Sequence, residues 1–192
     1  MTEDDLVVRA KTDRSAFGRL YDRYYAPVYR SCVRRLFDRT VADDVVSEVF
    51  LTVASKLRAF VGTTEVDFRR WLFRIATNAV NAHLRQLQRR RELWEIAARQ
   101  REERLPSDHS LPGWEKLDWP VVYQAILDLD EREQTILSLR FFAGLSHDEI
   151  ADVVDATPGA VRTALSRTLS FLRKKFNPAS GTDQELRTIF RD

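Results

Sequence analysis

Six polar side chains between Phe68 and Arg91 have the chemistry of a nucleic acid contact. Arginines pair with phosphates, while amides and hydroxyls form hydrogen bonds with base edges. The six residues are Arg70, Arg74, Thr77, Asn78, Asn81 and Arg85. The stretch holds seven arginines and no acidic residue, whereas a merely solvated helix face mixes both signs. The sequence therefore favours nucleic acid contact over arginines that only cover a core.

The same stretch carries apolar residues at the spacing of an α-helix. They are Phe68, Leu72, Ile75 and Ala79, with Trp71 beside them. One side of the predicted helix must therefore be buried, and Trp71 is expected in the core rather than as a stacking surface. Asn78 and Asn81 fit solvent and base edges equally well. Asp67 is expected to cap this helix, after a loop from Val61 to Asp67.

A second candidate surface is acidic and lies on the preceding predicted helix. Thr40 is expected to cap that helix, and Gly62 to end it. Its buried stripe is predicted to be Val46, Val49, Phe50, Val53, Leu57 and Phe60. Its exposed face would carry Asp43, Asp44, Glu48 and Leu51. Complementing the helix dipole explains the first two acids, but Glu48 and Leu51 lie beyond the reach of that effect.

The N-terminal part predicts one short and one long amphipathic helix. Thr2 and Asp5 resemble a capping box for the short one, and Asp13 is a good N-cap for the long one. Pro27 predicts a kink or a break in the long helix, because it removes a backbone donor and clashes with the preceding turn. Four tyrosines on it are expected to form a packing seam. They are Tyr21, Tyr24, Tyr25 and Tyr29.

A change of composition divides the chain into two domains. Residues 105–117 have Pro, Ser, Asp and Gly at turn density and no periodicity, which predicts a linker. Trp114 and Trp119 are expected to dock this linker. The fold class expected is all-α, with two small helical domains at 1–104 and 118–176 and a C-terminal tail at 177–192.

The second domain has the pattern of a helix-turn-helix. Asp130 predicts one helix start, Ser146 with Glu149 a capping box, and Thr157 with Pro158 the start of a longer helix. A short helix, a tight turn and a longer helix place the last one in a DNA major groove. Its outward residues near the start would be Arg162, Thr163, Ser166 and Arg167. Residues 156–175 carry five basic groups and no acidic one, which suits a helix against phosphates.

Composition excludes several other functions. The net charge of the 192 residues is only +2, so the basic patches are local. The three histidines lie far from one another and have no cysteine or carboxylate partners at the spacing of metal ligands, which argues against a metal site or another cofactor. No apolar run reaches the length of a membrane span, and the acidic start MTEDDL is unlike a signal peptide. Cys32 is the single cysteine and is expected as a buried thiol in the cytoplasm.

Taken together, these segments resemble the extracytoplasmic function (ECF) group of bacterial RNA polymerase sigma factors. The resemblance rests on VADDVVSEVFLTV, then WLFRIATNAVNAHLRQLQRR, and after the linker LDLDEREQTILSLRFFAGLSHDEIADVVDATPGAVRTALSRTLSFLRKK. It extends to about Phe176. Each segment alone is a common pattern, whereas their order and separation are specific to the family.

The resemblance implies a role for each surface. The acidic helix with Asp43, Asp44, Glu48 and Leu51 would bind the clamp of core RNA polymerase. The arginine-rich helix would read and melt the minus-ten promoter element, with a non-template base flipped into a pocket bordered by the preceding loop. The helix-turn-helix would hold the minus-thirty-five element as duplex. An anti-sigma factor is implied as a further partner.

The chain departs from the family pattern at four positions. An acid common before the clamp-binding acids is Val41 here, and a frequent glutamine is Ser47; clamp binding is expected to survive both. In the recognition helix, Ala164 and Leu169 occupy positions that are often basic, so fewer duplex contacts are expected.

Two functions follow from these observations. The first is a promoter-specificity subunit without catalysis of its own, and the alternative is a free-standing helix-turn-helix regulator that binds its operator without polymerase. An enzyme acting on nucleic acid is disfavoured, because the chain lacks a carboxylate cluster, metal ligands and a nucleophile with a nearby base.

Overall fold

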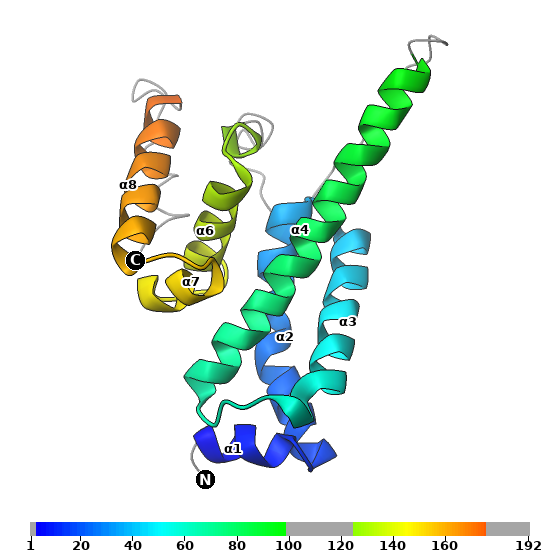
Figure 1. Ribbon diagram of the computed structural model, residues 1–192, viewed down its shortest axis with the longest axis vertical. Helices are drawn as coiled ribbons and strands as arrows, with labels where there is room; N and C mark the ends of the chain where they lie inside the picture. The colour runs from blue at the N-terminus through cyan, green and yellow to red at the C-terminus, as the bar shows by residue number, and fades with distance from the viewer. Residues whose placement is uncertain (1–2, 99–124, 176–192) are drawn as a thin grey trace.

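The computed structural model describes residues 3–98 and 125–175, and all regular structure in these two ranges is helical. Figure 1 shows the helices in chain order. They are α1 (Glu3–Ala10), α2 (Arg14–Leu36), α3 (Arg39–Lys56), the short 3₁₀ helix η1 (Leu57–Ala59), α4 (Glu65–Ala98), α6 (Glu131–Phe141), α7 (His147–Val153) and α8 (Pro158–Lys175). The predicted linker with Trp114, the nearby Trp119 and the predicted tail lie outside the described residues. No helix within them is both long and apolar enough to cross a membrane.

The long helix α2 is continuous, so the predicted break at Pro27 does not occur. Asp13 caps it as expected, accepting a hydrogen bond of 2.8 Å from the backbone N–H of Ser15. Tyr24 and Val28, on either side of Pro27, are both buried. A proline inside a helix costs about 3 kcal/mol, and burial of two such side chains offsets that cost.

Two predicted helix starts were displaced by a few residues. Asp38, not Thr40, caps α3, accepting a hydrogen bond of 3.0 Å from the backbone N–H of Val41. Helix α4 begins at Glu65, before Asp67. The backbone N–H of Asp67 donates to the hydroxyl of Thr64 at 3.1 Å. In return, the backbone N–H of Thr64 donates to the carboxylate of Asp67 at 3.3 Å. Asp67 therefore works from the third helical position of a capping box rather than from its cap.

The N-terminal helices pack around an aromatic core. Phe68 is buried at the start of α4, with its ring centroid 5.4 Å from that of Tyr24 and 6.0 Å from that of Trp71. Trp71 is half-buried and stacks on Phe60, with 4.7 Å between the two ring centroids. The predicted seam exists, since Tyr21 and Tyr25 contact each other and the ring of Phe50.

The C-terminal helices form the predicted helix-turn-helix. Complete capping boxes start α6 at Asp130 with Glu133 and α7 at Ser146 with Glu149. The hydroxyl of Thr157 accepts a hydrogen bond of 3.2 Å from the backbone N–H of Ala160 and so caps α8. The inward side of α8 is buried. Its residues are Val161, Leu165 and Leu172, with Thr168 in addition.

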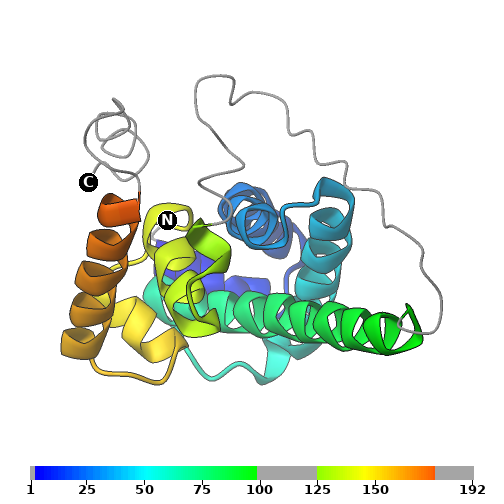
Figure 2. The same cartoon turned by 90° about the horizontal axis from the view of Figure 1, so that it is seen from above.

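The two halves pack against each other, which the sequence did not predict. A continuous core cluster joins residues of α2, α3 and α4 to residues of α6, α7 and α8. Where α2 meets α6, the hydroxyls of Ser31 and Ser138 share a buried hydrogen bond of 3.0 Å. Figures 1 and 2 show α7 beside the first turns of α4, while the second half of α4 extends away from the C-terminal helices. Helix α4 is therefore covered on two sides near its start.

Candidate nucleic acid interface

The six polar residues predicted on α4 divide by exposure. Arg74, Asn78 and Arg85 are exposed, whereas Arg70, Thr77 and Asn81 are partly buried. The reason is that the polar side of the first half of α4 faces α6 and α7 rather than solvent. The structure thus brings most of the predicted site to a boundary between the two halves of the molecule.

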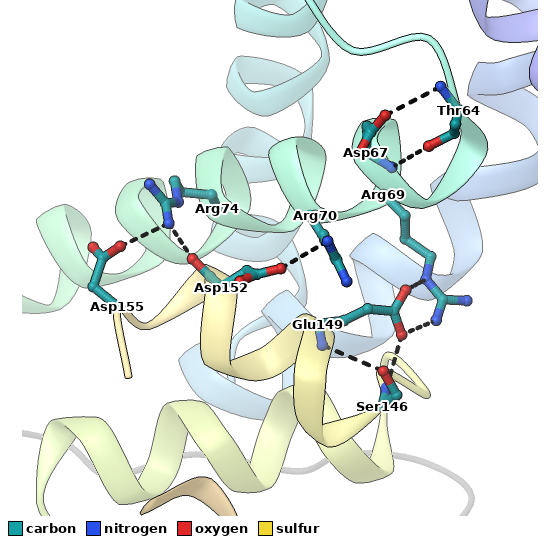
Figure 3. A network of polar contacts seen from close by, with 9 residues as sticks. All are labelled: Thr64, Asp67, Arg69, Arg70, Arg74, Ser146, Glu149, Asp152 and Asp155. Carbon is teal, nitrogen blue, oxygen red and sulfur yellow. Dashed lines mark hydrogen bonds and ion pairs between the residues drawn. The ribbon is translucent and has the colours of Figure 1, made fainter. Parts of the chain in front are cut away.

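Two of the predicted arginines form ion pairs with the helix-turn-helix (Figure 3). Nη1 of Arg70 lies 2.8 Å from Oδ2 of Asp152, and Nη2 of Arg74 lies 2.8 Å from Oδ1 of Asp155. Arg74 also donates to the backbone carbonyl of Asp152. Asp152 belongs to α7, and Asp155 follows it in the turn with a left-handed φ of 50°. This turn conformation places the Asp155 carboxylate against α4.

A third ion pair involves Arg69, which is not among the six residues predicted from the sequence. Its Nε donates to Oε1 of Glu149 at 2.6 Å, and its Nη2 donates to Oε2 of the same carboxylate. Glu149 is buried and also accepts from the backbone N–H of Ser146 at 2.9 Å. Arg69 is basic like its neighbour Arg70, so the arginine run itself was the signal that could have included it.

The ion pair between Arg69 and Glu149 shifts the pKa of both side chains away from their ordinary values. Burial alone would raise the pKa of Glu149, but the hydrogen bonds from Arg69 and Ser146 outweigh it, and the pKa lies below its usual value. Burial would likewise lower the pKa of Arg69, but Glu149 raises it above the ordinary value. Both groups are therefore charged at neutral pH.

We expect the stability contribution of Glu149 to depend on pH. Because its pKa is lowered in the folded state, the contribution is present above the unfolded pKa of about 4.3 and is lost as pH falls through the folded value. Glu149→Gln keeps a side-chain oxygen that can accept from the backbone N–H of Ser146, but it removes the negative charge. It should therefore lower the free energy of unfolding by about 1 to 3 kcal/mol at neutral pH. Urea denaturation near pH 7 and near pH 3 measures this. The difference in free energy of unfolding between the unsubstituted chain and Glu149→Gln should shrink at the lower pH. An equal difference at both pH values would mean that the charge of Glu149 does not stabilise the fold.

The remaining polar residues of α4 have separate surroundings. Nη1 of Arg85 lies 3.4 Å from Oε1 of Glu131 at the start of α6. Thr77 lines a small cavity of about 10 Å³ between α2, α4 and α6. Oδ1 of Asn81 is buried without a hydrogen-bond partner among the described residues, and Asn78 faces solvent.

The loop before α4 has one apolar side chain that is almost fully exposed. Val61 is 91% exposed, while the next residue is held tightly. Nζ of Lys11 donates to the carbonyl of Gly62 at 2.9 Å. A Cβ at Gly62 would lie 2.6 Å from Cβ of Asp67 and closer still to the ring of Phe60. Glycine is therefore required for the chain to pass between Phe60 and Asp67.

The acidic surface predicted on α3 is formed. Asp43, Asp44 and Glu48 are exposed, and Leu51 beside them is 71% exposed. The hydroxyl of Tyr25 donates to Oδ1 of Asp43 at 3.5 Å. These residues share one face of α3, and its opposite face is buried in the core.

The four residues predicted on the recognition helix all face solvent near the start of α8. They are Arg162, Thr163, Ser166 and Arg167. The hydroxyl of Thr163 donates to the carbonyl of Gly159 at 3.0 Å. This surface remains open even though α7 lies against α4.

Comparison with known proteins places both halves in described families. The family model of Sigma-70 region 2 matches residues 20–90, and that of Sigma-70, region 4 matches residues 121–172. The chain is 31% identical to the ECF RNA polymerase sigma-E factor of Haemophilus influenzae over 186 residues, which cover 93% of this chain and 97% of that relative.

Two further comparisons differ in coverage. The chain is 34% identical to the ECF RNA polymerase sigma factor BldN of Streptomyces coelicolor over 88% of its own length, but it spans only 64% of that relative. A solved structure of the sigma factor RpoE from Bartonella quintana, in complex with the anti-sigma factor NepR, has the same fold. Its TM-score is 0.66 at 18% identity, over 85% of this chain and 98% of that chain.

Proposed function

This chain belongs to the ECF RNA polymerase sigma factors, and from that premise we propose how its three surfaces divide the work of transcription initiation. The family assignment rests on the region 2 and region 4 matches together with the Haemophilus relative. We propose that residues 1–104 carry region 2, residues 118–176 region 4, and residues 105–117 the linker between them. The chain itself supplies recognition and no catalysis, and it acts in the cytoplasm.

The cationic face of α4 is the observation that carries the proposal. Each of Arg70, Arg74 and Arg85 already pairs with a carboxylate in this structure, so the face binds anionic oxygens. In the promoter complex, phosphates of the melted non-template strand replace these carboxylates. Thr77, Asn78 and Asn81 supply hydrogen-bonding groups for bases, and the loop with the exposed Val61 borders the site of an unstacked base.

The acidic surface of α3 is the proposed contact with core polymerase. Asp43, Asp44 and Glu48 provide negative charge, and Leu51 provides an apolar residue that is 71% exposed. A mixed acidic and apolar patch on a rigid helix suits a basic protein partner, because charge speeds association and the apolar side chain is buried in the complex.

The outward residues of α8 are the proposed minus-thirty-five contacts. They are Arg162, Thr163, Ser166 and Arg167. We expect Arg162→Ala to weaken binding to the upstream promoter element by about 5- to 150-fold, since one good base contact contributes about 1 to 3 kcal/mol. Footprinting of the polymerase complex would show lost upstream protection with polymerase binding unchanged. If Arg162→Ala reduced polymerase binding as much as substitutions on α3 do, the proposed division of labour would be wrong.

An anti-sigma factor is a further proposed partner. Support comes from the Bartonella structure, in which a sigma factor of the same fold is bound to the anti-sigma factor NepR. Such a partner would regulate the chain by covering its polymerase or promoter contacts.

Run-off transcription with purified core polymerase on genomic fragments tests the function. The chain should co-elute with core polymerase, and only the complex should start transcripts at defined sites. The free-standing regulator is not favoured by the family assignment, and it makes the opposite prediction of tight, sequence-specific duplex binding by the chain alone. Failure to co-elute with core polymerase would refute the sigma factor proposal for this chain.

A further inference from the structure

A lysine near the N-terminus holds the loop that is proposed to border the unstacked base. Nζ of Lys11 donates to the backbone carbonyl of Gly62 at 2.9 Å, although the two residues lie 51 positions apart in the chain. The same ammonium lies 5.4 Å from the centroid of the Phe60 ring. One side chain therefore contacts the loop on both sides of Val61, through a charge-assisted hydrogen bond and a cation–π contact.

The surroundings of Lys11 make it a fixed support for this loop. Lys11 follows α1 directly, in the turn that leads to α2. Figure 1 shows α1 below the chain segment that joins α3 to α4. Helix α1 is anchored in the N-terminal core by the buried side chains of Leu6, Val7 and Ala10. Because α1 is anchored in this way, the lysine ties the loop to the core of the N-terminal helices.

The two ends of the loop are held by contacts that do not involve Lys11. At the start of the loop, the ring of Phe60 stacks on Trp71 of α4, with 4.7 Å between the ring centroids. At its end, Thr64 and Asp67 form their reciprocal capping hydrogen bonds at the start of α4 (Figure 3). The segment 61–63 lies between these fixed ends, so its position is the one that depends on the lysine.

Val61 is the side chain that this support presents to solvent. It is 91% exposed, while the residues on either side of it contact Lys11. A backbone that is already held lowers the entropy cost of ordering the loop when a ligand arrives. The face of an unstacked base is a suitable ligand, because apolar side chains pack against bases that have left the stack.

We propose that Lys11 is a positioning residue for base selection, which fixes Val61 and its loop relative to α4 and so sets how well the loop receives the unstacked base. Lys11 acts through the loop and does not itself contact the base. The inference rests on the proposed function, in which this loop borders a base of the melted promoter strand. It adds a residue from the turn between α1 and α2 to the determinants of promoter choice.

Three single variants test the role of Lys11. Lys11→Met removes the ammonium but keeps a long unbranched side chain, so the hydrogen bond and the cation–π contact are both lost. Lys11→Arg restores a cation that can donate to a carbonyl and lie over an aromatic ring. Lys56→Met is the matched control, because Lys56 is an exposed lysine in the last turn of α3 and its loss changes the net charge equally.

The first measurement is made on the free chain by nuclear magnetic resonance relaxation. The backbone order parameters of residues 61–63 should be about 0.85 in the unsubstituted chain, as in rigid backbone, and should fall to about 0.6 in Lys11→Met. Lys11→Arg and Lys56→Met should keep the higher value. Unchanged order parameters in Lys11→Met would overturn the proposal, because the loop would then be fixed without the lysine.

The second measurement uses the complex of each variant with core polymerase. The probes are promoter fragments from a mapped start site with an unpaired minus-ten region, in which one non-template base at a time is replaced by an abasic unit. The unstacked base is the position at which its removal weakens binding most, by about tenfold or more for the unsubstituted chain. This preference for the base should shrink at least about threefold in Lys11→Met and return in Lys11→Arg. Affinity for the abasic probe should be the same in all variants.

The outcomes separate positioning from a general effect and from the proposed function. An undiminished base preference in Lys11→Met would overturn the role of the lysine, and so would equal weakening on the intact and abasic probes, which is the result for a phosphate contact or a folding defect. A different result would count against the proposed function itself. If no abasic position weakened binding by the unsubstituted complex, the loop would not receive a base, and the role of Lys11 in base selection would fall with it.

Discussion

Reversing the charge of two residues on α3 is expected to abolish binding to core RNA polymerase. Asp44→Arg with Glu48→Arg places two cations on the surface proposed to meet a basic partner, and like charges facing each other across an interface cost several kcal/mol. The dissociation constant should therefore rise by at least about 100-fold. Both side chains are exposed, so the circular dichroism spectrum and thermal unfolding should change little. Gel filtration with core polymerase measures the loss.

The control for this double variant is Asp22→Arg. Asp22 is an exposed acid on α2 outside the acidic surface of α3, so its reversal tests whether reversing an exposed acid elsewhere on the chain also weakens binding. Polymerase affinity within about threefold of the unsubstituted chain is expected for it. Equal loss in the control and the double variant would mean that α3 is not a specific docking surface.

Removing two arginines of α4 is expected to have opposite effects at two stages. Arg70→Ala with Arg74→Ala breaks the ion pairs with Asp152 and Asp155, so the free chain should expand. The same change removes two proposed phosphate contacts, so promoter opening by the polymerase complex should fall by at least about tenfold, with a reduced dependence on salt. Permanganate footprinting of unpaired thymines measures the opening, and scattering measures the expansion.

Arg14→Ala with Arg30→Ala is the matched control. Both arginines are exposed on α2, and the change in net charge is the same. The control should remain compact and open the promoter normally. Promoter opening at an unchanged level in the α4 variant would show that Arg70 and Arg74 serve only the contact with α7.

The sequence predicted the helices and the family because both depend on local signals. The caps at Asp130 and Asp13 and the capping box at Ser146 each act within one helical turn, and the structure confirms all three. The resemblance to ECF sigma factors is confirmed by the two family models and the Haemophilus relative. The roles of the individual site residues stay predictions.

The packing of one half on the other could not be predicted, because it depends on residues far apart in the chain. Helical periodicity selected one buried face on α4, yet Phe73, Ala76 and Val80 are buried too. A single-face pattern cannot show that a helix is covered from two sides. For the same reason Thr77 was assigned to the outward face, whereas it lines the cavity between α2, α4 and α6.

The displaced helix starts have a different cause. Thr40 and Asp67 are both residues that cap helices well, so their type was a correct signal. The structure uses Asp38 and Thr64 instead, because α3 and α4 each extend two or three residues further toward the N-terminus. Competing caps a few residues apart are decided by the packing of the first turn, which the local pattern does not contain.

The buried thiol of Cys32 gives the molecule a built-in chemical reporter. Cys32 is the only cysteine of the chain. It lines the small cavity between α2, α4 and α6 together with Ser138 and Leu139 of α6. Burial raises the pKa of its thiol to about 12, so almost no reactive thiolate exists at neutral pH while α6 packs on α2. Separation of α6 from α2 would hydrate the thiol, so the rate of its modification by a disulfide reagent would report in real time how often these two helices part.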